Sequence, residues 1–297
     1  MTSLVCIDGE LMEPAAARVP VFDRGFLYGD SVYEVVRTYL GVPFHLDRHL
    51  ERLERSAAAL ELALPPRATL VAWLKSALRA AGNPESYARL IVTRGSGPIT
   101  LDPTTADRPR TVLLVKALEP YPAWMYAQGI KVSVPAIRRN PRAALDPSVK
   151  SGNYLNNVLA LGQARRAGFD DALLLDIRGR VTEGSSSNVF AVRGGSLLTP
   201  PLETGLLHGV TRALVLELAG QVGLQAHERE LEVADLARAD ELWLTSTLRE
   251  VLPVVRLDEA TIGAGAPGPR YRAMAERLHA HALDWARAAA ADFWREP

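Results

Sequence analysis

The 297-residue chain lacks most features that mark secreted, membrane or nucleic-acid-binding proteins. Its single cysteine, Cys6, excludes an internal disulfide framework and is typical of a reducing cytosol. Equal numbers of basic and acidic residues, 34 of each, give no general attraction to nucleic acid or to an anionic membrane. No run approaches the roughly 18 apolar residues that cross a bilayer, and no signal peptide is apparent. We therefore expect a cytoplasmic protein that binds neither nucleic acid nor membrane.

Lysine is scarce as well, because the 34 basic residues comprise 30 arginines and only four lysines: Lys75, Lys116, Lys131 and Lys150. Arginine cannot be deprotonated in proteins, whereas a desolvated lysine can lose its proton and attack a carbonyl. Only Lys150 stands in an unusual context. The stretch SVKSGNYLNN places it before Gly152, which permits close backbone approach, and Asn153, which can cap the next helix. Lys150 is therefore a candidate nucleophile; the alternative is an ordinary lysine ahead of a helix.

Strand and helix patterns alternate irregularly along the chain. Strand patterns occur at 3–7, 86–95, 110–118, 130–136, 171–176, 240–246 and 251–256, with a hairpin within 31–44 that turns at Leu40–Gly41. Helical spacing of apolar residues predicts helices at 46–62, 68–81, 153–167, after Thr211, and at 268–290. The lack of regular βαβ alternation favours two α+β domains, and the prolines of EPYPAW indicate a linker. We expect domains at 1–118 and 128–297, joined by residues 119–127.

Four polar stretches interrupt the apolar pattern. EGSSSNVF (183–190) combines a carboxylate, hydroxyls and an amide, and LLHGVTR (206–212) opens a helix with its N–H groups forward. LTSTLREV (244–251) places three hydroxyl residues after a strand, and HLERLERS (49–56) adds Arg52. Each has an ordinary alternative, namely a hydrogen-bonded loop, a plain helix cap or a solvated arginine. Together with Lys150, they supply the groups that hold an aldehyde cofactor with a phosphate and a ring nitrogen.

These ordered blocks, with VFDRGFLYGDSVYEVVRTY near the start and YARLIVTRGSGPITLDP before the linker, resemble the class IV aminotransferases. These are fold-type IV pyridoxal-phosphate enzymes, and they include branched-chain and D-amino-acid aminotransferases and aminodeoxychorismate lyases. The resemblance covers nearly the whole chain. It implies a two-domain α+β fold, pyridoxal 5'-phosphate as cofactor, amino-acid and 2-oxo-acid substrates, and ping-pong transamination. It also implies a homodimer or a higher homo-oligomer.

The resemblance assigns roles to individual residues. Lys150 would bond to the cofactor's aldehyde and shuttle the substrate's proton, and Glu183, helped by Asn188, would pair with the pyridine nitrogen. Tyr154 would lie near the ring hydroxyl. The remaining cofactor-binding residues, most of them for the phosphate, would be Arg52, Val210, Thr211, Ser246 and Thr247.

Substrate choice depends on the strand in SYARLIVTRGSGPITLDP and on the hairpin before it. A Tyr-x-Arg pair resembles the branched-chain group, so Tyr87 and Arg89 would face the substrate, with Arg89 holding the distal carboxylate of glutamate. The other residues expected there are Tyr28, Tyr33, Arg37 and Leu248. The Arg-x-His pair usual in D-amino-acid aminotransferases is replaced by SGPITL. We expect an atypical branched-chain-type enzyme for apolar L-amino acids and 2-oxoglutarate; the alternatives are a D-amino-acid or (R)-amine transaminase, then an aminodeoxychorismate lyase.

Two arginines and a histidine pair leave other interpretations open. Arg37 and Arg249 could each bind a carboxylate or pair with Glu34 or Glu250 at the surface, and the surface pairing is favoured for Arg249. The stretch HLDRHLE (45–51) could place two histidines on one helix face as metal ligands. It lacks a clear third ligand, so we expect no metal.

Overall fold

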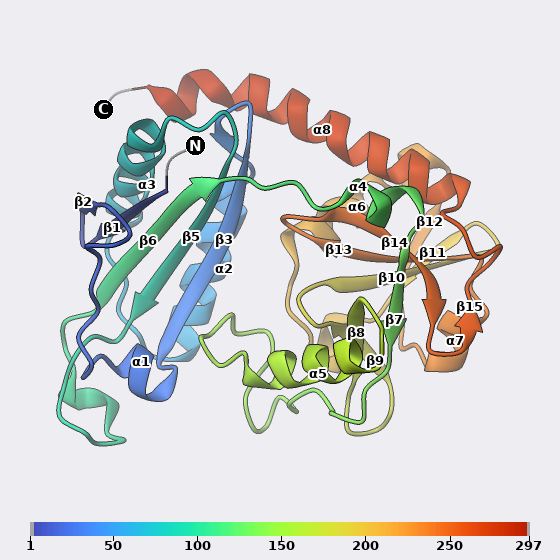
Figure 1. The fold of residues 1–297 in the computed structure, drawn as a ribbon, viewed down its shortest axis with the longest axis horizontal. Helices are drawn as coiled ribbons and strands as arrows, with labels where there is room; N and C mark the ends of the chain where they lie inside the picture. The colour runs from blue at the N-terminus through green and yellow to red at the C-terminus, as the bar shows by residue number, and fades with distance from the viewer. Residues whose placement is uncertain (1–2, 296–297) are drawn as a thin grey trace. The chain divides into compact units, whose positions relative to one another are not determined.

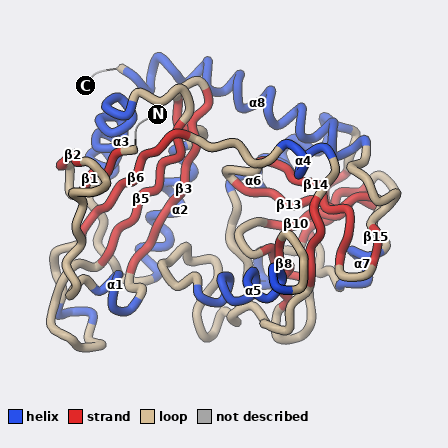
Figure 2. Tube along the Cα trace, viewed as in Figure 1, coloured by secondary structure: helices blue, strands red, loops and turns tan. Residues whose placement is uncertain are grey.

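The computed structural model describes residues 3–295, which form two compact units (Figure 1). The first unit comprises residues 3–119, 149–153 and 282–295, and the second comprises residues 120–148 and 154–281. Both units contain helices and a β-sheet, which Figure 2 distinguishes by colour. The α+β prediction is therefore confirmed. Among the described residues, no helix combines the length and apolar character needed to cross a membrane.

The first unit is built on an antiparallel six-stranded sheet, ordered β2-β1-β6-β5-β3-β4. The hairpin between β3 and β4 turns at Leu40 and Gly41 as expected; both have positive φ (52° and 74°), which a type I′ turn requires. Its elements are β1 (Leu4–Ile7), β2 (Glu10–Met12), α1 (Arg24–Tyr28), β3 (Ser31–Tyr39), β4 (Val42–Pro43), α2 (Leu46–Ala59), α3 (Arg67–Ala81), β5 (Ser86–Thr93), η1 (Pro103–Thr105) and β6 (Arg110–Ala117).

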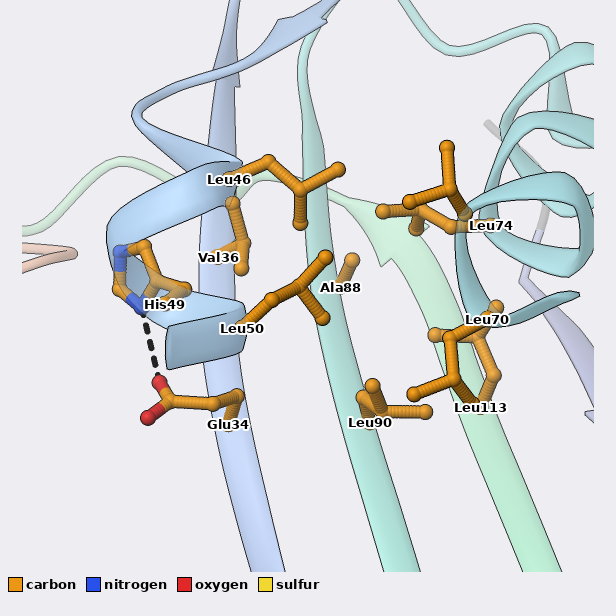
Figure 3. A pocket seen from close by; sticks show the side chains of 11 residues that line it. Glu34, Val36, Leu46, His49, Leu50, Leu70, Leu74, Ala88, Leu90 and Leu113 are labelled. Carbon is orange, nitrogen blue, oxygen red and sulfur yellow. Dashed lines mark hydrogen bonds and ion pairs between the residues drawn. The ribbon is translucent and has the colours of Figure 1, made fainter. Parts of the chain in front are cut away.

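Helices α2 and α3 cover one face of this sheet and bury their apolar stripes against it. Side chains alternate between the two faces of a strand, so Glu34 and Val36 of β3 point toward these helices while Tyr33 and Arg37 lie on the opposite face. A small cavity of about 20 Å³ lies under the helices (Figure 3). It is lined by Glu34, Val36, Leu46, His49, Leu50, Leu70, Val71, Leu74, Ala88, Leu90 and Leu113.

Shortening one leucine at this cavity is expected to destabilise the first unit strongly. Leu50 is 3% exposed and lines the cavity, so Leu50→Ala would enlarge a space that its neighbours already fail to fill. We expect a loss of about 2–5 kcal/mol in the free energy of unfolding, measured by urea denaturation. Leu50→Met, which nearly conserves volume, is the control and should cost less than about 1.5 kcal/mol. Equal stability of the alanine variant and wild type would contradict this packing.

The second unit contains a nine-stranded mixed sheet, ordered β12-β11-β10-β13-β14-β7-β8-β9, with β15 paired to β14. The pairs β11–β12, β14–β7 and β7–β8 are parallel. Its elements are α4 (Ala123–Ala127), β7 (Ile130–Ser133), α5 (Leu155–Arg166), β8 (Asp171–Leu175), β9 (Val181–Gly184), β10 (Asn188–Arg193), β11 (Ser196–Thr199), η2 (Leu202–Thr204), α6 (Val210–Leu218), η3 (Ala219–Val222), β12 (Gln225–Glu228), α7 (Val233–Ala237), β13 (Glu241–Ser246), β14 (Glu250–Leu257) and β15 (Ala260–Thr261).

Two segments cluster differently from the expected domain division. Residues 149–153, expected in the later domain, belong to the first unit because they pair with β3: the Tyr33 N–H donates to the Lys150 carbonyl (2.9 Å) and the Gly152 N–H to the Ser31 carbonyl (2.9 Å). The last helix, α8 (Pro269–Trp294), contributes residues 269–281 to the second unit and 282–294 to the first. Pairing between residues far apart in the chain leaves no pattern in the local sequence, so these two assignments could not be predicted from it.

Candidate active site

Lys150 is fixed by its backbone and buried by its neighbours in the first unit. Its N–H donates to Ser56 Oγ (3.1 Å) and its side chain is only 9% exposed. The Lys150 amine lies 3.4 Å from the Tyr33 hydroxyl and 4.5 Å from the centre of the Tyr33 ring. The expected cap at Asn153 is wrong: helix α5 has no side-chain cap, and Asn153 Nδ2 instead donates to the Gly29 carbonyl (3.1 Å). A desolvated amine beside an aromatic hydroxyl suits proton transfer.

Behind Tyr33, on the helix-facing side of β3, the Glu34 carboxylate binds two side chains of α2. Arg52 Nε donates to Oε1 (2.6 Å) and Arg52 Nη2 to Oε2 (2.7 Å), while His49 Nδ1 lies 2.8 Å from Oε2. Burial raises the pKa of Glu34, but Arg52 and His49 outweigh it and bring that pKa to about 2. Burial lowers the pKa of His49 despite the Glu34 charge. Arg52 is therefore held rigidly by a carboxylate that stays ionised.

Four of the predicted substrate residues lie on the face of the six-stranded sheet that is turned away from helices α2 and α3. In the β3–β5 register Arg37 is opposite Tyr87, Val35 opposite Arg89, and Tyr33 opposite Ile91, so all these side chains point the same way. The Arg89 guanidinium lies 4.1 Å from the Tyr33 ring centre, and its buried Nε has no hydrogen-bond partner among the described residues. A buried guanidinium nitrogen without a partner is costly unless an anion arrives.

The other two predicted substrate residues, Tyr28 and Leu248, lie outside β3 and β5. Tyr28 lies in α1, where its ring contacts the guanidinium of Arg24 at 5.0 Å. Arg37, which belongs to the shared face, has its guanidinium 4.2 Å from the centre of the Tyr39 ring. Leu248 belongs to the second unit, in the turn between β13 and β14.

Glu183, at the end of β9, holds two partners in the second unit. Its Oε1 accepts from Arg139 Nε (2.8 Å) and its Oε2 from the Leu207 N–H (2.9 Å). Asn188 joins the same group because its Nδ2 donates to the Leu207 carbonyl (3.0 Å). Arg139 also donates to Asn156 Oδ1 (3.2 Å). Arg139 was not predicted as a site residue, since nothing in the neighbouring sequence distinguishes it from the other arginines.

Helix α6 begins next to this group with its first N–H groups uncapped by any side chain. Gly209 occupies the cap position, and a Cβ there would overlap the Asn188 amide oxygen, so a larger residue would displace Asn188. Val210 and Thr211 are buried at the start of the helix, while Ser246 and Thr247 are half-buried at the β13–β14 turn. Backbone N–H groups and hydroxyls of this kind are the donors that a phosphate monoester requires. Tyr154 immediately precedes α5 and is half-buried.

The surface pairing favoured for Arg249 is wrong. Its side chain is buried, and its Nη1 donates to Asp171 Oδ2 (2.6 Å) while its Nη2 donates to Ser186 Oγ (2.8 Å). Burial lowers the pKa of Arg249, but Asp171 raises it more strongly, so the net direction is upward. A buried cation needs such a counterion, and the partner lies 78 positions earlier in the chain.

The donors in the two units fit pyridoxal phosphate in kind. A buried lysine amine suits a bond to an aldehyde, a buried carboxylate suits a pyridine nitrogen, and an uncapped helix start with hydroxyls suits a phosphate. These are the groups that an enzyme with an aldehyde cofactor requires.

Comparison with known proteins gives the family directly: residues 31–257 match amino-transferase class IV. The chain is 38% identical over 95% of its length to a putative branched-chain-amino-acid aminotransferase of Methanocaldococcus jannaschii, covering 97% of that protein. It is 36% identical over 89% of its length to a D-alanine aminotransferase of Bacillus licheniformis, covering 92% of it. Among solved structures, the T.th. branched-chain amino acid aminotransferase with pyridoxamine 5'-phosphate superimposes with a TM-score of 0.91 at 28% identity, covering 96% of this chain and 95% of that one.

The chain therefore belongs to the class IV aminotransferases. It has the fold-type IV architecture, it is an aminotransferase, and its cofactor is pyridoxal 5'-phosphate. Its substrates are amino acids and 2-oxo acids, as the sequence predicted. The individual residue assignments stay predictions.

Proposed function

We propose that the chain transfers amino groups from apolar L-amino acids, branched-chain ones first, to 2-oxoglutarate by a ping-pong mechanism. The observation that carries this proposal is the shared sheet face of Tyr33, Arg37, Tyr87 and Arg89, with the Lys150 amine against Tyr33. Aromatic rings offer an apolar wall for a branched side chain, and an arginine offers a carboxylate contact. The 38% identical putative branched-chain enzyme supports the same donor class.

In the proposed mechanism, the Lys150 amine would hold the cofactor's aldehyde until an incoming amino group takes its place. The amine freed in this exchange would then take the substrate's α-proton and return it. Pyridoxal phosphate, when bound, supplies a ring that withdraws electrons from the carbon losing that proton. Glu183, oriented by Arg139 and the Leu207 N–H, holds the proton of the ring nitrogen, with Asn188 and Tyr154 completing the ring contacts. The residues that would hold the phosphate are Arg52 of the first unit and, in the second unit, the Val210 and Thr211 N–H groups with the hydroxyls of Thr211, Ser246 and Thr247. Exclusion of water by the buried Lys150 segment favours these transfers.

D-amino acids are the second candidate donors, because a D-alanine aminotransferase is 36% identical to the chain. Steady-state rates with L-leucine, D-alanine and (R)-phenylethylamine, each with 2-oxoglutarate, decide between them. We expect the highest kcat/KM with L-leucine. Strong D-alanine turnover beside negligible L-leucine turnover would overturn the proposal. Release of pyruvate from aminodeoxychorismate without an amino acceptor would instead indicate a lyase.

Arg89 provides a sharper test of the acceptor. Arg89→Met removes the proposed contact to the distal carboxylate of 2-oxoglutarate, so its KM should rise by about 10- to 100-fold, as expected for a lost charge-assisted hydrogen bond. The KM for L-leucine should stay within about twofold because its side chain carries no charge. Arg110→Met, which removes a partly exposed arginine on β6, is the control and should change neither. Equal effects of Arg89→Met on both substrates would contradict the assignment.

We further propose a cytoplasmic homodimer or higher homo-oligomer. In the first unit, Arg24 Nη1 donates to the Thr100 carbonyl (2.7 Å) and so ties the 21–26 segment, which includes the start of α1, to the 99–102 loop. These two segments carry large exposed apolar side chains: Val21, Phe22, Phe26, Ile99 and Leu101, which are 53–81% exposed. A second copy of the chain would cover them. Sedimentation as a monomer at micromolar concentration would contradict this.

A further inference from the structure

The turn between β13 and β14 is strained, and it carries two of the proposed site residues. It contains only Thr247, Leu248 and Arg249, and the next residue, Glu250, has a φ of 55°. A non-glycine residue in the left-handed region persists only where its surroundings fix it. Something must therefore hold this turn.

Arg249 makes the buried contacts that tie this turn to other parts of the unit, beside the Tyr126 hydroxyl, which donates to the Arg249 carbonyl (3.4 Å). Its Nη1 donates to Asp171 Oδ2 (2.6 Å) and its Nη2 to Ser186 Oγ (2.8 Å). Asp171 is 1% exposed, and its Oδ1 accepts from the Ser185 hydroxyl and from the Ala172 N–H (2.8 Å). The turn is closed from within as well, because the Arg249 N–H donates to Ser246 Oγ (3.3 Å).

This arrangement joins two loops that carry proposed cofactor residues. The Ser185–Ser187 loop directly follows Glu183 and Gly184 of β9 and precedes Asn188 of β10. The second loop is the β13–β14 turn, in which Thr247 and Leu248 directly precede Arg249. Asp171 and Ser186 each engage one terminal nitrogen of the guanidinium, so Arg249 ties the turn to β8 and to the Ser185–Ser187 loop.

We propose that Arg249 is a positioning residue: together with Asp171 it fixes the strained turn so that Thr247 presents its hydroxyl to the cofactor's phosphate. This inference rests on the proposed role of Thr247. Arginine suits the task because its planar fork reaches two acceptors at once from a single rigid group. Loosening the turn should weaken contacts to the phosphate while leaving contacts to the pyridine ring in place.

The test compares two ligands that differ only in the phosphate. The full-length chain is dialysed free of cofactor, and dissociation constants are measured by absorbance for pyridoxal phosphate and for pyridoxal. Arg249→Met should raise the dissociation constant of pyridoxal phosphate about tenfold or more, and Thr247→Val should do the same. Neither variant should change the dissociation constant of pyridoxal by more than about twofold. Arg180→Met removes an arginine that pairs with Asp176 in the same unit, and should change neither constant.

A second variant separates positioning from loss of stability. Arg249→Met leaves Asp171 buried without its counterion, whereas the double variant Asp171→Leu/Arg249→Met removes both charges, a replacement that proteins often tolerate. The double variant should melt near the wild-type temperature yet show the same selective loss of pyridoxal phosphate affinity. The inference would be overturned if the double variant bound pyridoxal phosphate with wild-type affinity, or if its affinities for pyridoxal phosphate and pyridoxal fell equally. If wild type binds both ligands equally, or Thr247→Val has no effect, the proposed phosphate role of Thr247 fails as well.

Discussion

Replacing Lys150 with arginine is expected to lower kcat by at least about 10³-fold although the positive charge is kept. The physical reason is that a guanidinium stays protonated at any accessible pH, so it can neither bond to an aldehyde nor accept the substrate's α-proton. Lys150 is 9% exposed, and its amine is 3.4 Å from the Tyr33 hydroxyl, so no other lysine shares its surroundings. The measurement is 2-oxo acid formation from the best donor.

Lys116→Arg is the matched control for this experiment. Lys116 lies on β6 and pairs with Glu119 at 3.1 Å, with 45% of its side chain exposed, so arginine should support wild-type rates there. Thermal unfolding of both variants, followed by circular dichroism, separates lost chemistry from lost folding. Transamination by Lys150→Arg at close to the wild-type rate would show that the amine at this position is not the reactive group.

The second large effect is expected at Glu34. Glu34→Gln preserves the shape of the side chain but leaves the buried Arg52 guanidinium without its counterion, and should cost about 3–5 kcal/mol of unfolding free energy at pH 7. The measurement is urea denaturation of the cofactor-free chain. Glu54→Gln is the control, on the helix α2 that also carries Arg52. Glu54 is half-exposed and its long 4.0 Å ion pair with Arg67 is weak, so the variant should cost no more than about 0.5 kcal/mol.

The same cluster predicts how stability depends on pH. Folding lowers the pKa of Glu34 from 4.5 to about 2, so its contribution of roughly 3 kcal/mol is complete above pH 4.5 and is lost as the pH falls toward 2. The lowered pKa of His49 acts in the same direction, because the unfolded chain takes up a proton below the ordinary value of 6.5. Wild type should therefore lose stability between about pH 6 and pH 2, and Glu34→Gln should lose less. Parallel profiles for the two proteins would contradict this.

Local patterns predicted those parts of the structure that depend on neighbouring residues. The hairpin at Leu40–Gly41, helices α2 and α3, and the uncapped start of α6 are all present where turn residues and apolar spacing indicated them. The short elements α1, α7, β2 and β12 were missed, because segments of three to five residues carry too few positions for a period to emerge. The family resemblance in turn rested on several ordered motifs rather than on any single one.

Partners distant in the chain could not be predicted. Glu183 was singled out for its polar context, yet its partner Arg139 lies 44 positions earlier, and Asp171 lies 78 positions before Arg249. Such pairs form because burial forces each charge to find a counterion, and only the fold decides which one is near. The expected surface role of Arg249 failed for this reason: its neighbour Glu250 was close in sequence, whereas Asp171 was close in space.

The central claim is that the nitrogen of Lys150 is the one that bonds to pyridoxal phosphate. Borohydride reduction of the cofactor-loaded enzyme, followed by peptide mass spectrometry, tests that claim most directly because it makes the bond permanent. We predict a single phosphopyridoxyl adduct on the peptide that contains SVKSGNY. An adduct at Lys75, Lys116 or Lys131 instead, or none on any peptide, would contradict the account.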